Sequence, residues 1–143
     1  KQINILKEEG VEPHHIYIGH INNTPDRDYH RELARLGVWL GWDINNPFGR
    51  PNLPSWQQRT DYLKGLLDED LGRNLMLSHD WNIVLTRLAS PGFPTREENP
   101  DGYLWLTRAV IPRLKEAGIG QSIIDELMKG NPKRYFEGLK PGS

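Results

Sequence analysis

The sequence predicts an α/β fold, the C-terminal part of a (β/α)8 TIM barrel comprising about strands six to eight with their helices. Three segments share one plan, in which a short apolar strand ends in a polar residue and leads through a loop into an amphipathic helix. We expect these strands at residues 16–20, 38–43 and 74–80. Strands that alternate with helices at about 30 residues per unit are typical of a parallel sheet with helices packed outside it. A full barrel has eight such units in roughly 250 residues, so this chain would hold the last three, preceded by a helix at residues 2–9.

Helix signals follow the first two predicted strands. Thr24 can cap a helix, and Pro25 suits its first turn, so the first helix is expected to begin there and to stop at Gly37. We expect three residues to form its sheet-facing side, Tyr29, Leu33 and Leu36. In the second unit, Ser55 and Gln58 have the spacing of a capping box at the start of an amphipathic helix.

The segment after the third strand is expected to be longer and less regular. It would contain a loop to about Pro100 and then a helix at residues 104–118. Because proline removes a backbone hydrogen bond, this helix would bend at Pro112. A short helix from about Ser122 and a final turn at 131–132 would complete the chain.

Composition narrows the classes of function. At 143 residues the chain is long enough for one domain with a core. The 18 Lys and Arg balance the 19 Asp and Glu to a net charge of -1, and they form no basic stripe, so a nucleic-acid partner is not expected. The apolar runs are too short for a membrane span, and we expect a cytoplasmic protein. With no cysteine, any metal would be held by histidine, carboxylates or a modified lysine.

Three polar residues stand where the predicted strands end. His20, Asp43 and Asp80 would each point into the mouth of a barrel, where the loops after the strands form active sites. A single strand-end His or Asp is more often a helix cap or a loop hydrogen-bonding residue. Three in register instead favour a shared site, because imidazole and carboxylate are the ligands of a hydrolytic divalent metal.

Six fragments in order resemble the C-terminal half of the phosphotriesterase family, which includes phosphotriesterases and phosphotriesterase-like lactonases. The fragments are Val11-Glu12-Pro13, Ile18-Gly19-His20, Gly41-Trp42-Asp43, Leu77-Ser78-His79-Asp80-Trp81, Val110-Ile111-Pro112-Arg113-Leu114 and Asn131-Pro132-Lys133-Arg134-Tyr135-Phe136. The resemblance spans nearly the whole chain. It implies a (β/α)8 barrel with two divalent metals, usually zinc, and a metal-bridging hydroxide that attacks phosphotriesters, lactones or carboxylic esters.

The resemblance also implies roles for particular residues. His20 matches the strand-six histidine that binds the more exposed metal. Asp80 matches the strand-eight aspartate that binds the more buried metal and accepts the proton of the hydroxide, so it is the candidate catalytic residue. Asp43 matches a strand-seven aspartate near the site and is not expected to be a ligand. The remaining ligands of the family belong to strands one, four and five, which have no counterpart in this sequence.

Two positions depart from the family pattern. Asn23 stands where the family often has an aspartate that passes the proton outward, and an amide cannot relay a proton in that way. Ile44 stands where phosphotriesterases have a histidine and many lactonases an arginine. We therefore place Asn23, Asp43, Ile44 and Trp81 in a candidate substrate pocket, to which Trp42 and the loops at 45–49 and 90–93 could contribute apolar surface.

Other histidines and tryptophans have simpler interpretations. We expect solvent-exposed positions for His14, His15 and His30. Strand alternation points His79 away from Asp80, which favours packing over metal binding. Three tryptophans, Trp39, Trp56 and Trp105, are most simply core residues.

The leading hypothesis is a metal-dependent hydrolase acting on a small-molecule ester, lactone or phosphotriester, with residues 1–143 as the C-terminal half of its barrel. Ester or lactone hydrolysis is favoured, because the strand-seven histidine of phosphotriesterases is absent. Two alternatives remain open: a non-catalytic half-barrel that serves as an interaction module, and a related barrel enzyme that hydrolyses amides. Alone, the chain is expected to be inactive, to expose apolar inner faces of its strands, and to associate with itself or with the missing half.

Overall fold

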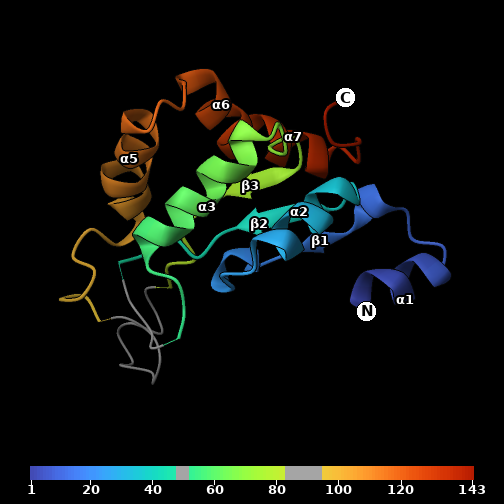
Figure 1. Ribbon diagram of the computed structural model, residues 1–143, viewed down its shortest axis with the longest axis horizontal. Helices are drawn as coiled ribbons and strands as arrows, with labels where there is room; N and C mark the ends of the chain where they lie inside the picture. The colour runs from blue at the N-terminus through green and yellow to red at the C-terminus, as the bar shows by residue number, and fades with distance from the viewer. Residues whose placement is uncertain (48–51, 83–94) are drawn as a thin grey trace.

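The fold is built on three parallel strands, as the sequence predicts (Figure 1). A computed structural model describes residues 1–47, 52–82 and 95–143. The strands are β1 (Tyr17–Ile18), β2 (Trp39–Trp42) and β3 (Leu75–Leu77), in the order β1-β2-β3. Tyr17 pairs with Trp39, and Leu40 pairs with Leu75, so all three strands end at the same edge of the sheet.

Helices connect and flank these strands. Helix α1 (Gln2–Glu8) precedes the sheet, α2 (Arg27–Arg35) joins β1 to β2, and α3 (Trp56–Asp68) joins β2 to β3. The segment after β3 contains α5 (Ile111–Glu116), α6 (Gln121–Asp125) and α7 (Asn131–Phe136). Short 3-10 turns occur at η1 (Pro13–His15), η2 (Ile21–Asn23) and η3 (Gly102–Leu104). Within the described ranges, no helix is both long and apolar enough to cross a membrane.

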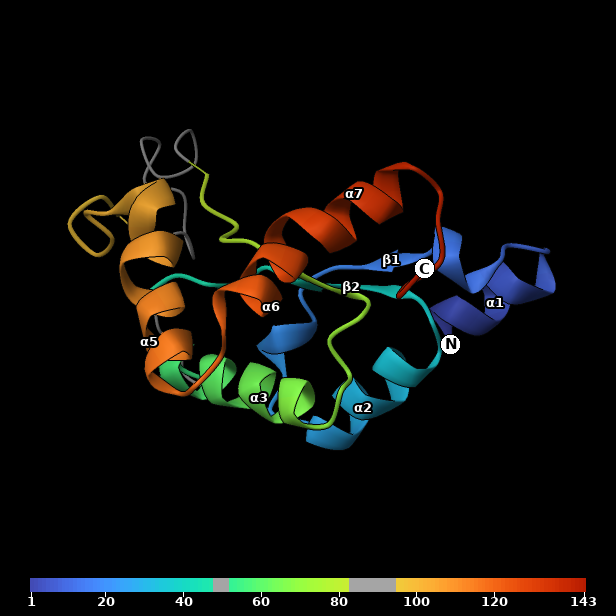
Figure 2. The same cartoon turned by 90° about the horizontal axis from the view of Figure 1, so that it is seen from above.

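The two faces of the sheet bury different kinds of residue. One face joins the main hydrophobic core with α2 and α3 and carries Ile16, Val38, Leu40, Trp42, Leu75 and Leu77. Because strand residues alternate between faces, the other face carries Tyr17, Trp39, Gly41 and Met76. Figure 2 shows α2 and α3 on one side of β1 and β2, with α7 on the other.

The second face exposes less apolar surface than the sequence predicts. Tyr17 is the one strand residue that is more than a third exposed, whereas all of β2 and β3 is buried. Tyr135 of α7 packs against Tyr17 and Trp39, with ring centroids 5.8 and 6.0 Å apart. The expectation was wrong because α7 covers the N-terminal ends of these strands and because the face includes a glycine at position 41.

Helix α2 turns a different side to the sheet from the one expected. Tyr29 and Leu36 are 39% and 46% exposed, whereas His30 and Leu33 are buried. His30 lies edge-on to Trp42, with ring centroids 5.1 Å apart. The interpretation of His30 as a solvated residue was therefore wrong, because this side of α2 packs against Trp42 and the Ile21 carbonyl.

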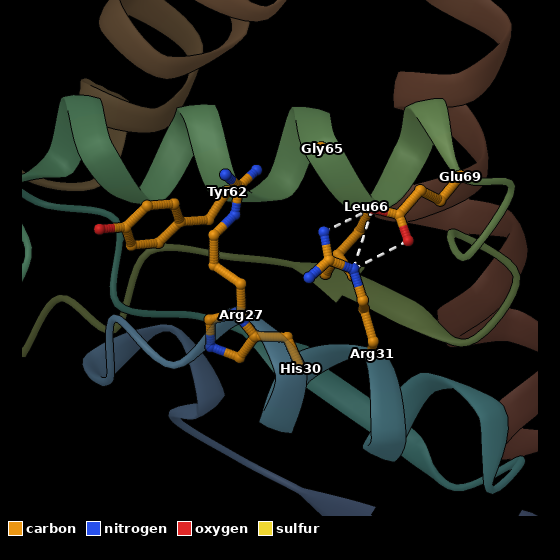
Figure 3. A pocket seen from close by; sticks show the side chains of 7 residues that line it. All are labelled: Arg27, His30, Arg31, Tyr62, Gly65, Leu66 and Glu69. Atoms are coloured by element: carbon orange, nitrogen blue, oxygen red, sulfur yellow. Dashed lines mark hydrogen bonds and ion pairs between the residues drawn. The ribbon is translucent and has the colours of Figure 1, made fainter.

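A polar contact holds α2 against α3 (Figure 3). Arg31 donates to both carboxylate oxygens of Glu69, at 2.7 to 2.9 Å, which lowers the pKa of Glu69. Arg27 lies over the ring of Tyr62, 5.6 Å from its centroid. The Arg27 guanidinium also lies against Gly65 of α3.

The helices after β3 contain π-helical segments, and the last helix is longer than expected. A π-helical segment, η4 (Leu106–Val110), leads without a break into α5, and another, η5 (Glu126–Gly130), joins α6 to α7. Each π segment ends two residues before a proline, Pro112 or Pro132, whose ring would clash with the carbonyl one turn earlier in a regular α-helix. Residues 121–136 thus form one continuous helix, not the short helix and separate turn predicted from the sequence.

Asn131 anchors this long helix to the sheet. Its side chain is fully buried, and Nδ2 donates to the carbonyls of Gly72 and Leu75 at 3.0 and 2.8 Å. Both carbonyls lie at or just before the start of β3, and that of Gly72 also accepts from the Leu75 amide at 3.2 Å. The asparagine therefore fixes the position of the helix with respect to β3.

We predict that Asn131→Ala lowers the free energy of unfolding by about 2 kcal/mol, because two hydrogen bonds donated by a fully buried side chain are lost. Urea unfolding followed by circular dichroism measures this loss. Gln121→Ala is the matched control, because it removes an exposed amide contact to Asp125 in the same helix. Equal effects of the two substitutions would contradict the anchoring role.

Candidate metal and catalytic site

The three residues expected at one edge of the sheet do follow the ends of the three strands. His20, Asp43 and Asp80 come after β1, β2 and β3, respectively. His20 has φ 59° and Asp80 has φ 52°, which places both in the left-handed region. Of the residues that the structure describes, only two others besides glycines share this conformation, Asn52 and Asp70. Backbone strain of this kind concentrates at functional sites, where surrounding contacts hold it.

Asp43 holds His20 by two contacts. Its Oδ1 accepts from the ring Nδ1 and from the backbone amide of His20, both at 2.9 Å. Its Oδ2 accepts from the Tyr17 hydroxyl at 3.1 Å, so both carboxylate oxygens have a donor. The hydrogen bond from Asp43 raises the pKa of His20, and burial together with Asp43 raises the pKa of Tyr17.

This arrangement leaves the other side of the imidazole available. The His20 side chain is 57% exposed, and its Nδ1 is the nitrogen that faces Asp43. A ligand histidine whose second nitrogen donates to a carboxylate is a recurrent arrangement in metal sites, because the carboxylate fixes the ring and its tautomer. Asp43 is thus placed to orient the imidazole of His20.

Gly41 makes room for this cluster. It lies on the same face of β2 as Asp43, and a Cβ there would overlap both the Tyr17 hydroxyl and an Asp43 oxygen. Gly19, on the neighbouring loop, also lies against these two side chains. The glycine in the Gly41-Trp42-Asp43 fragment is therefore required by the packing of the site.

Asp80 differs from Asp43 in having no hydrogen-bond donor within the described part of the chain. Burial raises the pKa of its carboxyl group above the ordinary value, and the charge of Asp43 adds to the effect. The negative charge of Asp80 in turn raises the pKa of His20, which places the two groups in one electrostatic environment. A carboxylate without a protein donor has oxygens available for a cation or a water.

His79 is directed elsewhere. Its ring packs edge-on against Tyr103 with centroids 4.9 Å apart, and its Nδ1 accepts from the amide of Trp81 at 3.0 Å. Burial lowers its pKa. This is the packing role that strand alternation predicts.

The candidate pocket residues divide into two groups. Asn23 and Asp43 lie at or beside the His20 loop, and an open hollow of about 460 Å³ next to it is lined by Gly19, His20, Ile21, Asn23, Thr24, Asp26 and Tyr29. Trp81 is 9% exposed and lies against Gly102, and Trp42 is buried in the core. Trp42 therefore does not line a pocket, because it points to the face opposite Asp43.

The loop at Ile44 is held by its backbone. Asn22, which is fully buried, accepts from the Ile44 amide at 3.2 Å and donates to the Ile44 carbonyl at 3.0 Å. Asn45 donates to the carbonyls of Trp42 and Ser78, at 2.6 and 2.7 Å, and so ties the ends of β2 and β3. Residues 48–49 and 90–93, also named as candidate pocket segments, lie outside the described residues.

Sequence reasoning missed three residues that build the site: Tyr17, Asn22 and Arg59. Arg59 of α3 is 1% exposed and donates to the Ile44 carbonyl and to Asn23 Oδ1. Its spacing to Leu63 and Leu66 puts it on the buried side of an amphipathic helix, which is a signal that the sequence contains. Asn22 and Tyr17 give no such signal, because their partners lie on another strand.

His30 supports the loop that carries His20. Its Nε2 donates to the carbonyl of Ile21 at 2.8 Å from a position that is 1% exposed. Burial lowers its pKa below the ordinary value of 6.5. The ring is therefore held neutral, and its protonation opposes folding.

The residues present fit part of a metal site. His20 offers an oriented imidazole, and Asp80 offers a carboxylate with unshared oxygens. No group of three or more His, Asp or Glu side chains is arranged around one metal position in the stretches that the structure describes. Two donors of this chemistry suit zinc or a similar divalent ion, which takes nitrogen and oxygen ligands.

The fold and this site define an α/β protein whose parallel strands carry polar side chains after their C-terminal ends. A comparison with known families identifies the class to which it belongs. The profile of the Phosphotriesterase family matches residues 1–136, so the chain belongs to this family.

Individual relatives agree with this assignment. The chain is 28% identical to the aryldialkylphosphatase of Saccharolobus solfataricus and 32% identical to the N-acetyltaurine hydrolase of Dictyostelium discoideum, over 95% and 96% of its length. It spans 43% and 37% of those two proteins. It also superimposes on the organophosphorus hydrolase of Deinococcus radiodurans with a TM-score of 0.77 and 29% identity, covering 94% of this chain and 41% of that one. The structure is thus consistent with part of a barrel.

We predict that the buried His30 makes the protein less stable as the pH falls below about 6.5, toward its lowered folded-state pKa. The unfolded chain takes up a proton in this window before the folded chain does, so acid favours unfolding. In His30→Gln the amide can still donate to Ile21 but cannot titrate. Urea midpoints at pH 7.5 and 5.5 should therefore fall further in the parent than in His30→Gln, and parallel losses would count against this role.

Proposed function

We propose that the protein is a metal-dependent hydrolase that cleaves a lactone, carboxylic ester or phosphotriester. The observation that carries the proposal is that His20, paired with Asp43, and an Asp80 carboxylate with no donor among the described residues follow the ends of neighbouring strands. Membership of the phosphotriesterase family supports it. The activities in the names of relatives belong to chains of which this one covers only part, so the substrate is inferred from the site.

The chemistry divides among three side chains. His20 would bind the metal through Nε2, because Nδ1 is engaged by Asp43. Asp80 would bind it through carboxylate oxygens and take a proton from the attacking water. Asp43 would keep the imidazole in one tautomer and one orientation. A bound divalent metal supplies Lewis acidity and lowers the pKa of water toward neutrality.

The proposed metal centre contains two zinc ions in the complete protein. His20 and Asp80 are too few to hold two ions, so the remaining ligands would come from outside residues 1–143. The part of the complete protein that supplies these ligands would also cover β1, the edge strand on which Tyr17 is exposed. A second copy of this chain is the other candidate for that position.

The side chain at position 44 bears on the substrate. Ile44 is an apolar residue next to Asp43, and it offers no donor to a phosphoryl oxygen or a leaving group. This favours an ester or lactone over a phosphotriester. The hollow beside His20 is lined mainly by polar side chains and suits a substrate with a polar portion.

Amide hydrolysis is the second candidate. One relative carries the name N-acetyltaurine hydrolase and is 32% identical to this chain over 146 aligned residues. The same His20 and Asp80 would serve, because attack of water on an amide carbonyl needs the same metal ligands and the same proton acceptor. A non-catalytic half-barrel is the remaining alternative, and it predicts no turnover of any of these substrates.

We predict that in the complete protein His20→Ala and Asp80→Ala each lower kcat/KM by more than about 100-fold, because loss of a ligand exceeds the loss of a supporting partner. His79→Ala and His14→Ala should retain most activity. A panel of a lactone, a carboxylic ester, a phosphotriester and an N-acyl amide measures both the loss and the preferred class. Near-normal turnover by Asp80→Ala would contradict the mechanism. A preference for the amide substrate would favour amide hydrolysis, the second candidate.

We also predict that residues 1–143 alone bind little zinc, show no measurable turnover and associate through the open edges of the sheet at β1 and β3. Mass by light scattering and zinc by elemental analysis test this directly. The control is the same chain mixed with a separately produced upstream segment of the complete protein, which should restore zinc binding. A monodisperse monomer that holds two zinc ions and turns over a lactone would refute the division of the site.

A further inference from the structure

Arg59 is a buried cation that the proposed chemistry does not use. It lies near the start of α3 and is 1% exposed. A charge at this depth is costly unless hydrogen bonds compensate it. Nη1 donates to the carbonyl of Ile44 at 3.1 Å, and Nη2 donates to Asn23 Oδ1 at 3.3 Å. One guanidinium therefore contacts two loops that are distant in sequence.

These two loops carry the candidate site. Asn23 ends η2, the turn that begins directly after His20, and Ile44 directly follows Asp43. The Ile44 carbonyl also accepts from Asn22, so this peptide is held from the first loop and from α3. The contacts between His20 and Asp43, at 2.9 Å, span the same two loops.

The geometry of the contact suits arginine in particular. A planar guanidinium presents donors in a rigid fork, whereas a lysine ammonium is a single centre at the end of a flexible chain. Two acceptors on different loops can therefore be bridged by arginine, while lysine would satisfy one of them.

We propose that Arg59 is a positioning residue, which locks the loops after β1 and β2 together and thereby fixes His20 against Asp43. The inference rests on the proposed function only in taking His20 as the metal ligand. The proposed restraint acts on the His20 ring and is present without metal or substrate.

The test reads the His20 ring directly. The chain has five histidines, so nitrogen spectra of 15N-histidine-labelled protein contain few signals. In Arg59→Lys and in Asn23→Ala, we expect the His20 ring signals to shift toward their positions in Asp43→Asn, a reference in which the ring loses its carboxylate partner. The signals of His14 and His79 should keep their parent positions, because neither residue contacts these loops through Arg59.

Arg31→Met is the matched control. It removes a guanidinium contact between α2 and α3 but does not touch either loop, so it should leave the His20 signals in place. If Arg59→Lys does not fold, Asn23→Ala decides the matter, because it deletes a single acceptor. Folded variants with parent-like His20 signals would overturn the proposal even if hydrolysis were confirmed. Shifted signals would uphold it even if no substrate were turned over.

Discussion

One constraint shapes the whole structure. Where the hydrogen bonding between strands stops, the backbone N–H and C=O groups at the strand ends still need partners. Four buried asparagines meet this need. Asn22 pairs with both backbone groups of Ile44, Asn45 bridges Trp42 and Ser78, Asn74 donates to Ala34 and Val38, and Asn131 donates to Gly72 and Leu75. An amide side chain offers both donors and an acceptor, so it can replace a neighbouring peptide group. These side chains extend the hydrogen bonding beyond the short strands and so help to keep the strands in register.

The candidate site builds on the same constraint. Asn22 and Asn45 fix the peptides on either side of the strand ends, so that Asp43 can place both of its oxygens on defined donors. His20 and Asp80 occupy left-handed backbone conformations, which are tolerated where neighbouring contacts leave the chain no alternative. The polar groups that perform the proposed chemistry are thus held by other polar groups, while the hydrophobic core supports the opposite face of the sheet.

The sequence predicted the elements better than it predicted their contacts. The parallel strands and the capping box at Ser55 were confirmed, since both follow from local pattern. The buried side of α2 was not foreseen. His30 is a polar residue by type, and its burial depends on the Ile21 carbonyl and the Trp42 ring, which only the fold brings next to it. The pairing of His20 with Asp43 joins residues 23 positions apart, and its geometry depends on the absence of a Cβ at Gly41. Trp42, by contrast, could have been assigned to the core from strand alternation alone.

The way in which Ile44 is held bears on how such a site can diversify. Its amide and its carbonyl are both bound by Asn22, and its carbonyl also accepts from Arg59, so the hydrogen bonds that restrain the backbone involve no atom of the isoleucine side chain. Side chains at this position can therefore be exchanged during evolution while the loop keeps its shape. Such a scaffold would let substitutions at position 44 change the proposed pocket one residue at a time, without first disturbing the geometry of His20 and Asp43.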